Sequence, residues 1–299
     1  MSLENEGLSL FQAAKLAGVE FTRSVTPKNK TIELNGLKFH YLDWGNENKA
    51  PVLLLHGALQ QSHSWDFVSL SLCQDYHVIA LDARGHGDSD WDPNHDYSLD
   101  AHQKDLDAFV ETLGLEQFIL IGHSMGGRNA FVFASRHRVG IRGLIIVDTG
   151  PKTDPRGTNR IRQFRELPDK LATYQEFAER VHQYTGRPLK HVLGALKYVI
   201  RQLPDGKWTW KYDSAMRNPN YRVITWPETK LWEALGKIYI PTLIIRGEES
   251  DVFENETLNL MLASMPNATS TVIPKAGHLV PGDNPPAFIN AVKTFLAEL

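Results

Sequence analysis

One serine stands in a setting that suits nucleophilic chemistry. The segment Gly122-His123-Ser124-Met125-Gly126-Gly127 directly follows the apolar run 118–121 and precedes an apolar helical pattern over about 128–137. A Gly-x-Ser-x-Gly sequence between a strand and a helix predicts a tight, strained turn that exposes the serine hydroxyl. The glycines two residues away on either side are small enough for the close approach that such a turn requires. Ser124 is therefore the candidate nucleophile.

A serine hydroxyl is a weak nucleophile at neutral pH, so it needs a general base that an acid orients. The predicted base is His278, in the loop before the closing helix. Loops of this kind lie at the C-terminal edge of a parallel sheet, where α/β proteins place their sites. The predicted acid is Asp251, which follows the strand-like run 242–245. Asp148 is the rival, because it ends an earlier strand whose edge also lies near the serine.

Acyl transfer also needs two N–H groups that stabilise the negative charge developing on the carbonyl oxygen. The Met125 N–H, at the start of the helix after the nucleophile, is predicted to supply one of them. The other is expected from the loop His56-Gly57-Ala58-Leu59, which follows the apolar run 52–55. Ala58 is the predicted donor in that loop, and Leu59 is the alternative.

Short apolar runs indicate the elements that position these residues. Their alternation with helical patterns predicts an α/β protein with a mostly parallel sheet covered by helices. The chain opens differently, with two strands joined by Asn35-Gly36, a sequence typical of a hairpin turn. The predicted strands cover 31–34, 38–44, 52–55, 78–81, 118–121, 144–147 and 242–245.

Residues 151–235 interrupt this alternation. Their apolar residues follow helical spacing, and helices are predicted around 171–181 and 189–203. They hold 16 Lys and Arg against 9 Asp and Glu, a net charge of +7, while the whole chain carries −3. A helical insertion between core strands predicts a lid over one end of the sheet. Its charge suggests that substrates are anionic and are steered by the lid, unless these charges face bulk solvent and are screened.

Composition narrows the class of protein. With 299 residues, 42% hydrophobic and 22% charged, the chain has the composition of a globular protein. The near-neutral net charge does not indicate binding to nucleic acids. No apolar run approaches the ~20 residues that a membrane-spanning helix needs. A single cysteine, Cys73, excludes an internal disulfide and a multi-thiolate metal site. The acidic N-terminus is unlike a signal peptide. We therefore expect a cytoplasmic monomer or homodimer.

The order Ser124, Asp251, His278 resembles that of the α/β-hydrolase superfamily, in its serine-nucleophile, esterase-like branch with a helical cap. The upstream motifs His56-Gly57 and Asp82-Ala83-Arg84-Gly85-His86-Gly87-Asp88-Ser89 belong to the same resemblance. It implies a mostly parallel central sheet flanked by helices, with a cap inserted after the sixth strand, and a structural role for the Arg-Gly-His-Gly turn. The implied division is an N-terminal extension 1–30, a core formed by 31–150 and 236–299, and a cap at 151–235.

The resemblance also implies an activity. A serine hydrolase of this kind cleaves carboxylic esters of small or medium acyl groups through an acyl-enzyme, with Ser124, His278 and Asp251 as its triad and no metal or organic cofactor. Lactone opening and carbon–carbon bond hydrolysis use the same triad and are the alternatives. A ligand receptor with slow turnover is the alternative of another class. The expected partner is a small-molecule ester, anionic esters included, and neither a nucleic acid nor a membrane.

Overall fold

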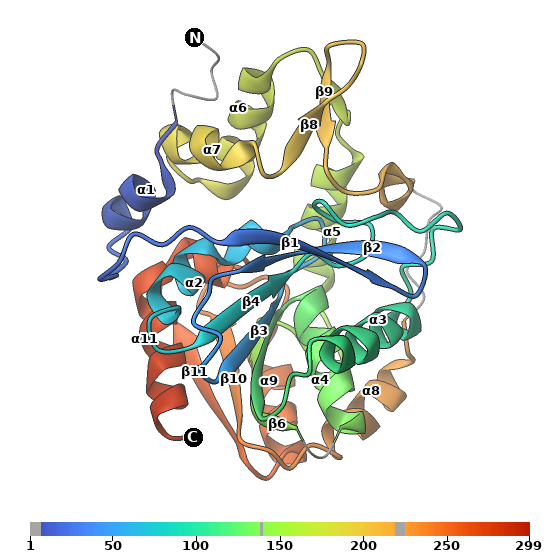
Figure 1. Cartoon of the computed structure of the whole chain (residues 1–299). Helices are drawn as coiled ribbons and strands as arrows, with labels where there is room; N and C mark the ends of the chain where they lie inside the picture. The colour runs from blue at the N-terminus through green and yellow to red at the C-terminus, as the bar shows by residue number, and fades with distance from the viewer. Residues whose placement is uncertain (1–6, 138–139, 219–224) are drawn as a thin grey trace.

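A computed structural model of the chain describes residues 7–137, 140–218 and 225–299. An eight-stranded sheet lies at its centre (Figure 1). In spatial order its strands are β1 (Lys28–Leu34), β2 (Leu37–Asp43), β4 (His77–Leu81), β3 (Pro51–Leu55), β5 (Phe118–His123), β6 (Ile141–Val147), β10 (Thr242–Gly247) and β11 (Ala268–Ile273). The pairs β1–β2 and β2–β4 are antiparallel, and all the other pairs are parallel. The predicted α/β class and mostly parallel sheet are confirmed.

The predicted hairpin forms the antiparallel edge of this sheet. Asn35 and Gly36 have φ angles of 52° and 79°, and Leu34 pairs with Leu37 across the turn. Two consecutive positive φ angles suit the right-handed twist of the two strands, which is why Asn-Gly is favoured there.

Helices cover both faces of the sheet (Figure 1). Each face is built around an apolar cluster, with Phe109 fully buried on one side and Phe288 fully buried on the other. The first cluster includes residues of α3 (Leu99–Thr112), α4 (Met125–Arg136), α8 (Glu228–Leu235) and α9 (Asn255–Ser264). The second includes residues of α1 (Leu10–Leu16), the 3-10 helix η2 (Ser62–Trp65), α2 (Asp66–Leu72), α10 (Val280–Asp283) and α11 (Pro285–Ala297).

A separate layer lies above the sheet in Figure 1, between β6 and α8 in the chain. It has its own apolar cluster, centred on Phe177 and Trp210. Its elements are α5 (Pro155–Glu166), β7 (Lys170–Leu171), α6 (Tyr174–Thr185), α7 (Leu189–Leu196), β8 (Ile200–Gln202), β9 (Trp208–Trp210) and the 3-10 helix η3 (Ser214–Arg217).

Two features of this upper layer differ from the sequence-based expectation. The helix predicted over 189–203 ends at Leu196, because 200–202 instead pair with the aromatic strand β9 in a three-stranded sheet. The last helix of the predicted insertion, α8, packs on α4 with Leu231 and Leu235 in the core cluster. The elements of the upper layer therefore end before α8.

Buried polar contacts fix the upper layer to the core. The carboxylate of Asp213 is buried and accepts hydrogen bonds from the Tyr97 hydroxyl and from His95 Nδ1 at 2.7 Å. The Asp213 N–H donates to the Gly85 carbonyl oxygen at 2.9 Å. At the other end, the Leu8 N–H donates to the Lys190 carbonyl oxygen at 3.0 Å. In the described parts of the chain, no helix is long and apolar enough to cross a membrane.

Candidate active site

Ser124 lies on the strained turn that the sequence predicts, between β5 and α4. Its φ and ψ angles are 53° and −115°, which an L-residue rarely adopts. A Cβ atom on Gly122 would lie 2.2 Å from the Gly126 carbonyl oxygen, and one on Gly126 would lie 2.3 Å from the Leu55 carbonyl oxygen. Only glycine fits at either position, so the turn holds the serine at the C-terminal edge of the sheet.

The structure brings His278 between the serine and a carboxylate. His278 Nε2 lies 3.0 Å from Ser124 Oγ, and His278 Nδ1 lies 2.8 Å from Asp148 Oδ2. An ionised carboxylate only accepts hydrogen bonds, so Nδ1 carries the proton and Nε2 is free to accept the serine proton. The Asp148 carboxylate is fully buried and also accepts from the Gly247 N–H at 2.9 Å and the Ser250 hydroxyl at 2.5 Å.

The expectation that Asp251 orients the histidine is therefore wrong, and the rival Asp148 occupies that position. Asp251 Oδ1 instead pairs with Arg160 Nη2 at 3.1 Å, with 28% of the Asp251 side chain exposed. The Asp251 carbonyl oxygen accepts a hydrogen bond from the Gly157 N–H at 2.8 Å. The loop after β10 therefore holds the first turn of α5 in place. The physical reason lies in strand order: β6 lies directly beside β5, whereas β10, which precedes Asp251, is one strand further away.

Two histidines hold the backbone around the site in place. His123 Nε2 donates to the carbonyl oxygen of His278 at 2.7 Å, which fixes the loop that carries His278. His56 Nδ1 donates to the Gly57 carbonyl oxygen at 2.8 Å, and its Nε2 accepts from the Ala83 N–H at 3.0 Å. His56 therefore ties the loop after β3 to the turn 82–89.

The loop after β3 offers N–H groups on the open side of Ser124. The Gln60 N–H donates to the Gly57 carbonyl oxygen at 3.2 Å, so Ala58 and Leu59 are the central residues of a tight turn, with Leu59 at a φ of 63°. Within the described residues, the N–H groups of Ala58, Leu59 and Met125 have no hydrogen-bond partner. All three residues line a cavity that contains Ser124, so this arrangement suits a site for an oxyanion.

Three buried histidines near the site give a prediction for stability. Burial lowers the pKa of His86, of His102 and of His123 to about 3, far below the ~6.5 of an unfolded chain. Between these values the unfolded chain binds more protons than the folded one, so the free energy of unfolding falls as the pH falls from 6.5. Each histidine contributes up to about 1.4 kcal/mol per pH unit. Urea unfolding at pH 7, 6 and 5 measures this slope; His102→Asn should make it shallower, and equal stability at all three pH values would contradict the prediction.

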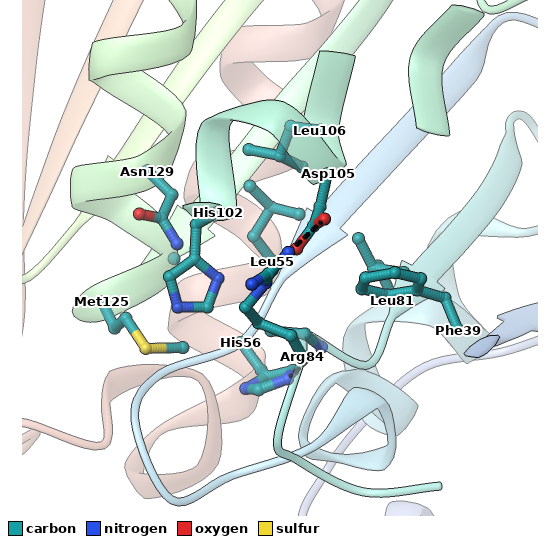
Figure 2. Close-up of a pocket in the computed structure, with 12 residues that line it drawn as sticks. Phe39, Leu55, His56, Leu81, Arg84, His102, Asp105, Leu106, Met125 and Asn129 are labelled. Atoms are coloured by element: carbon teal, nitrogen blue, oxygen red, sulfur yellow. Dashed lines mark hydrogen bonds and ion pairs between the residues drawn. The ribbon is translucent and has the colours of Figure 1, made fainter. Parts of the chain in front are cut away.

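Met125 is one of the residues that line a small cavity of about 20 Å³, and Figure 2 shows these residues. Arg84 crosses one side of it and forms two hydrogen bonds to Asp105, at 2.5 and 2.8 Å. His102 and Asn129 line the opposite side. Its volume admits about one water molecule, so it is too small for a substrate. The buried Arg84–Asp105 pair gives the turn 82–89 the structural role that the family resemblance implied.

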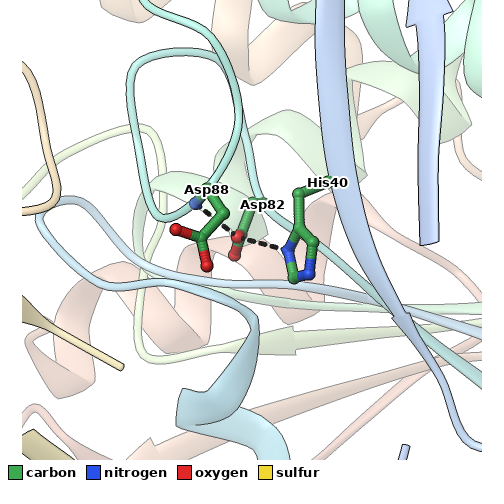
Figure 3. A group of neighbouring side chains, drawn as sticks. All are labelled: His40, Asp82 and Asp88. Atoms are coloured by element: carbon green, nitrogen blue, oxygen red, sulfur yellow. Dashed lines mark hydrogen bonds and ion pairs between the residues drawn. The ribbon is translucent and has the colours of Figure 1, made fainter. Parts of the chain in front are cut away.

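A second group of polar side chains has the residue types of a metal site, namely His40, Asp82 and Asp88 (Figure 3). The Asp82 carboxylate accepts from His40 Nδ1 at 2.7 Å, from the Asp88 N–H at 2.9 Å and from the Ser62 N–H at 2.6 Å. The Asp88 carboxylate pairs with Lys211 of the upper layer at 2.7 Å. Since protein donors already occupy these oxygens, the group braces the turn and the upper layer above it.

Two cavities meet at Ser124. Both are lined by Ala58, Leu59, Ser124 and Ile161. The first, here called the His278 cavity, has a volume of about 180 Å³ and is also lined by Phe164, Tyr184, Arg187, Trp210, His278 and Leu279. The second, here called the arginine cavity, has a volume of about 260 Å³ and is also lined by Met125, Arg128, Asn129, Thr149, Thr158 and Arg165. Ser124 therefore has open space on either side, and α5 forms part of the wall of both cavities.

Comparison with known proteins agrees with this architecture. Residues 50–285 match the family described as the alpha/beta hydrolase fold. The chain belongs to this family. The family resemblance seen in the sequence motifs is thereby confirmed, and the protein is a hydrolase.

Relatives and solved structures of the family extend over most of the chain. The chain is 28% identical over 271 residues to the 3-hydroxybutyrate-oligomer hydrolase of Cupriavidus necator, covering 86% of this chain and 90% of the relative. It is 24% identical to the esterase YbfF of Escherichia coli, covering 83% of this chain and 94% of the relative. The crystal structure of an α/β hydrolase from Novosphingobium aromaticivorans superposes with a TM-score of 0.79 at 25% identity, covering 93% of this chain and all of the other.

Proposed function

We propose that this hydrolase cleaves carboxylic esters of small or medium acyl groups through an acyl-enzyme. The observation that carries the proposal is the continuous hydrogen-bonded chain from Ser124 through His278 to the buried Asp148. The names of the relatives, which include an esterase and an oligomer hydrolase, support the same class of substrate.

In the proposed mechanism, Ser124 Oγ attacks the ester carbonyl while His278 Nε2 takes its proton. Asp148 keeps the imidazole in the required tautomer and stabilises the imidazolium that forms. The developing oxyanion lies against the Met125 N–H and an N–H of the loop after β3, with Ala58 as donor and Leu59 as the alternative. His278 then returns the proton to the leaving alcohol, and water repeats the sequence on the acyl-enzyme.

We also propose that the layer from α5 to η3 is the cap over this site. It supplies Ile161, Phe164 and Trp210 to the walls beside Ser124, so it limits the size of the acyl and alcohol groups that fit. The expectations of a cytoplasmic location and of a monomer or homodimer stay predictions.

The proposal is tested with 4-nitrophenyl esters from acetate to decanoate. We expect turnover that peaks at short or medium chain length, because the two cavities are of moderate volume. Folded protein that hydrolyses none of these esters would contradict the ester proposal. Lactones and vinylogous diketones are tested in parallel. Faster turnover of either class than of the esters would favour lactone opening or carbon–carbon bond hydrolysis. A ligand that raises the melting temperature without any turnover would favour the receptor alternative.

A further inference from the structure

Two arginines in the arginine cavity have no acidic partner. Arg128 lies on α4, one turn beyond Ser124, and Arg165 lies on α5. Both line the cavity, and each has a buried Nε atom without a hydrogen-bond partner in the described part of the chain. Among the described residues, the Arg128 guanidinium forms one hydrogen bond, from Nη2 to the Gly150 carbonyl oxygen at 3.3 Å.

The surroundings of these arginines lack negative charge. None of the residues that line the arginine cavity is Asp or Glu, and neither arginine forms an ion pair among the described residues. Burial lowers the pKa of Arg128, and no carboxylate opposes that effect. A half-buried cation without an ionic partner is costly, so its presence beside Ser124 points to a charge that arrives with the substrate.

Several other arginines of the upper layer do have acidic partners. Arg160 pairs with Asp251 at 3.1 Å, and Arg162 is exposed and pairs with Glu166 at 3.9 Å. Arg187, in the His278 cavity, faces Asp283 at 3.7 Å. Arg180 and Arg217 donate to backbone carbonyl oxygens and Arg201 lies over the Trp91 ring, so these three also lack an acidic partner among the described residues. Arg128 and Arg165 differ from them because they share a cavity with Ser124.

The position of His278 decides which part of an ester this cavity receives. His278 returns its proton to the leaving alcohol, so the alcohol must lie on the side of Ser124 where His278 is. His278 and Leu279 line the other cavity. The acyl chain, held with its carbonyl oxygen near Met125 and Ala58, then extends into the arginine cavity.

We infer that Arg128 and Arg165 form a carboxylate-binding subsite for the acyl group, so that the preferred substrates are half-esters of short dicarboxylic acids. This inference rests on the ester hydrolysis proposed above and names its substrate class. A carboxylate at the far end of the acyl chain would accept charge-assisted hydrogen bonds from both guanidinium groups. Both arginines act as binding residues, and neither takes part in proton transfer.

The test compares each half-ester with a neutral ester of the same shape. The substrates are the 4-nitrophenyl half-esters of succinate, glutarate and adipate, each beside the ester in which a primary amide replaces the free carboxylate. The readout is the ratio of kcat/KM for the acid to kcat/KM for the amide, after subtraction of spontaneous cleavage. We expect a ratio of about 10 to 100 for the best chain length, because an ionised hydrogen-bond partner contributes about that factor.

Single variants locate the effect. Arg128→Met and Arg165→Met should each lower the ratio about tenfold and leave turnover of the neutral amide within about threefold. Arg128→Lys should retain part of the ratio. Arg162→Met is the matched control, since it removes the same charge from the outer side of α5, and it should leave the ratio unchanged.

Three outcomes would overturn the inference. One is equal turnover of acid and amide by the unaltered protein. Another is an equal loss of the ratio in Arg162→Met, which would mean steering by the overall charge of the cap. The third is a uniform loss on both substrates in Arg128→Met together with a lower melting temperature, which would mean a structural arginine. We expect its melting temperature to hold or rise, since an unpaired buried charge is removed.

Direct binding separates this inference from the proposed esterase activity. Ser124→Ala protein, titrated calorimetrically with glutarate and with glutaramide, reports the subsite without turnover. Glutarate binding that Arg128→Met weakens about tenfold would support the subsite even if no ester is cleaved. Absence of any preference for glutarate over glutaramide would overturn it, while leaving hydrolysis of neutral esters as the proposed function.

Discussion

Asp148→Asn should lower kcat on the order of 10⁴-fold. The amide nitrogen of asparagine would donate to His278 Nδ1 where the carboxylate now accepts, at 2.8 Å. The imidazole would then carry its proton on Nε2, which faces Ser124 Oγ, and could no longer accept the serine proton. Steady-state hydrolysis of the best 4-nitrophenyl ester measures the loss, and thermal unfolding checks that the variant is folded.

Asp251→Asn is the matched control for this variant. It makes the same chemical change in the loop after β10, but the side chain that it alters pairs with Arg160 and is partly exposed. Exposed ion pairs contribute about 0–1 kcal/mol to stability, so we expect kcat within about threefold of the unaltered protein. If Asp251→Asn instead lost as much activity as Asp148→Asn, the assignment of the acid to β6 would be wrong.

Ser124→Ala should reduce ester hydrolysis on the order of 10⁵- to 10⁶-fold in kcat, because no other group can form the acyl-enzyme. The same ester assay measures the loss. A mass increase equal to the acyl group, trapped on the intact protein and absent from Ser124→Ala, identifies the site directly. Activity that persists in this variant would place the chemistry on another residue.

Ser124→Gly is a companion variant that separates chemistry from backbone strain. It lacks the nucleophile as well, but glycine adopts a φ of 53° without the steric cost that alanine incurs. We expect both variants to be inactive and the glycine variant to be the more stable by about 1 kcal/mol, as measured by urea unfolding. A less stable glycine variant would indicate that the turn is not strained.

The sequence predicted those parts of the site that local patterns determine. The elbow around Ser124 depends on glycines two residues away and on a strand followed by a helix, all within one short segment. His278 could be found because its loop follows the last strand. The hairpin at Asn35-Gly36 follows from the φ angles that only a few residue types tolerate.

The acid could not be decided in this way, because the answer depends on strand order in space. Asp148 and Asp251 both follow buried strands, and both strands end at the same edge of the sheet. Only the contacts of the folded chain distinguish them: Gly247 and Ser250, from the later strand and its loop, donate to Asp148 and so complete its site. Ser250, whose hydroxyl donates to Asp148, directly precedes Asp251 in the sequence. A search of the sequence for a polar partner of the acid could have noted this serine.

The sequence also could not predict the arginine cavity, because its two arginines are far apart in the chain. Arg128 belongs to the helix after the nucleophile, and Arg165 belongs to the first helix of the upper layer. Their shared cavity arises because α5 docks on the loop that contains Asp251. The net charge of residues 151–235 raised the hypothesis of an anionic substrate, but it did not indicate which basic residues would face one.

The docking of α5 on residues 251–252 also bears on how substrate range can diversify. Asp148, which contacts His278, directly follows β6, so the Asp251 side chain is left to hold α5 through Arg160, and the Asp251 carbonyl oxygen holds it through Gly157. Substitution of the Asp251 side chain would shift the helix that carries Ile161 and Arg165 and would keep Ser250, whose hydroxyl donates to Asp148. For directed evolution, these few residues are the place to begin a library that alters which acyl groups fit while the reaction itself is kept.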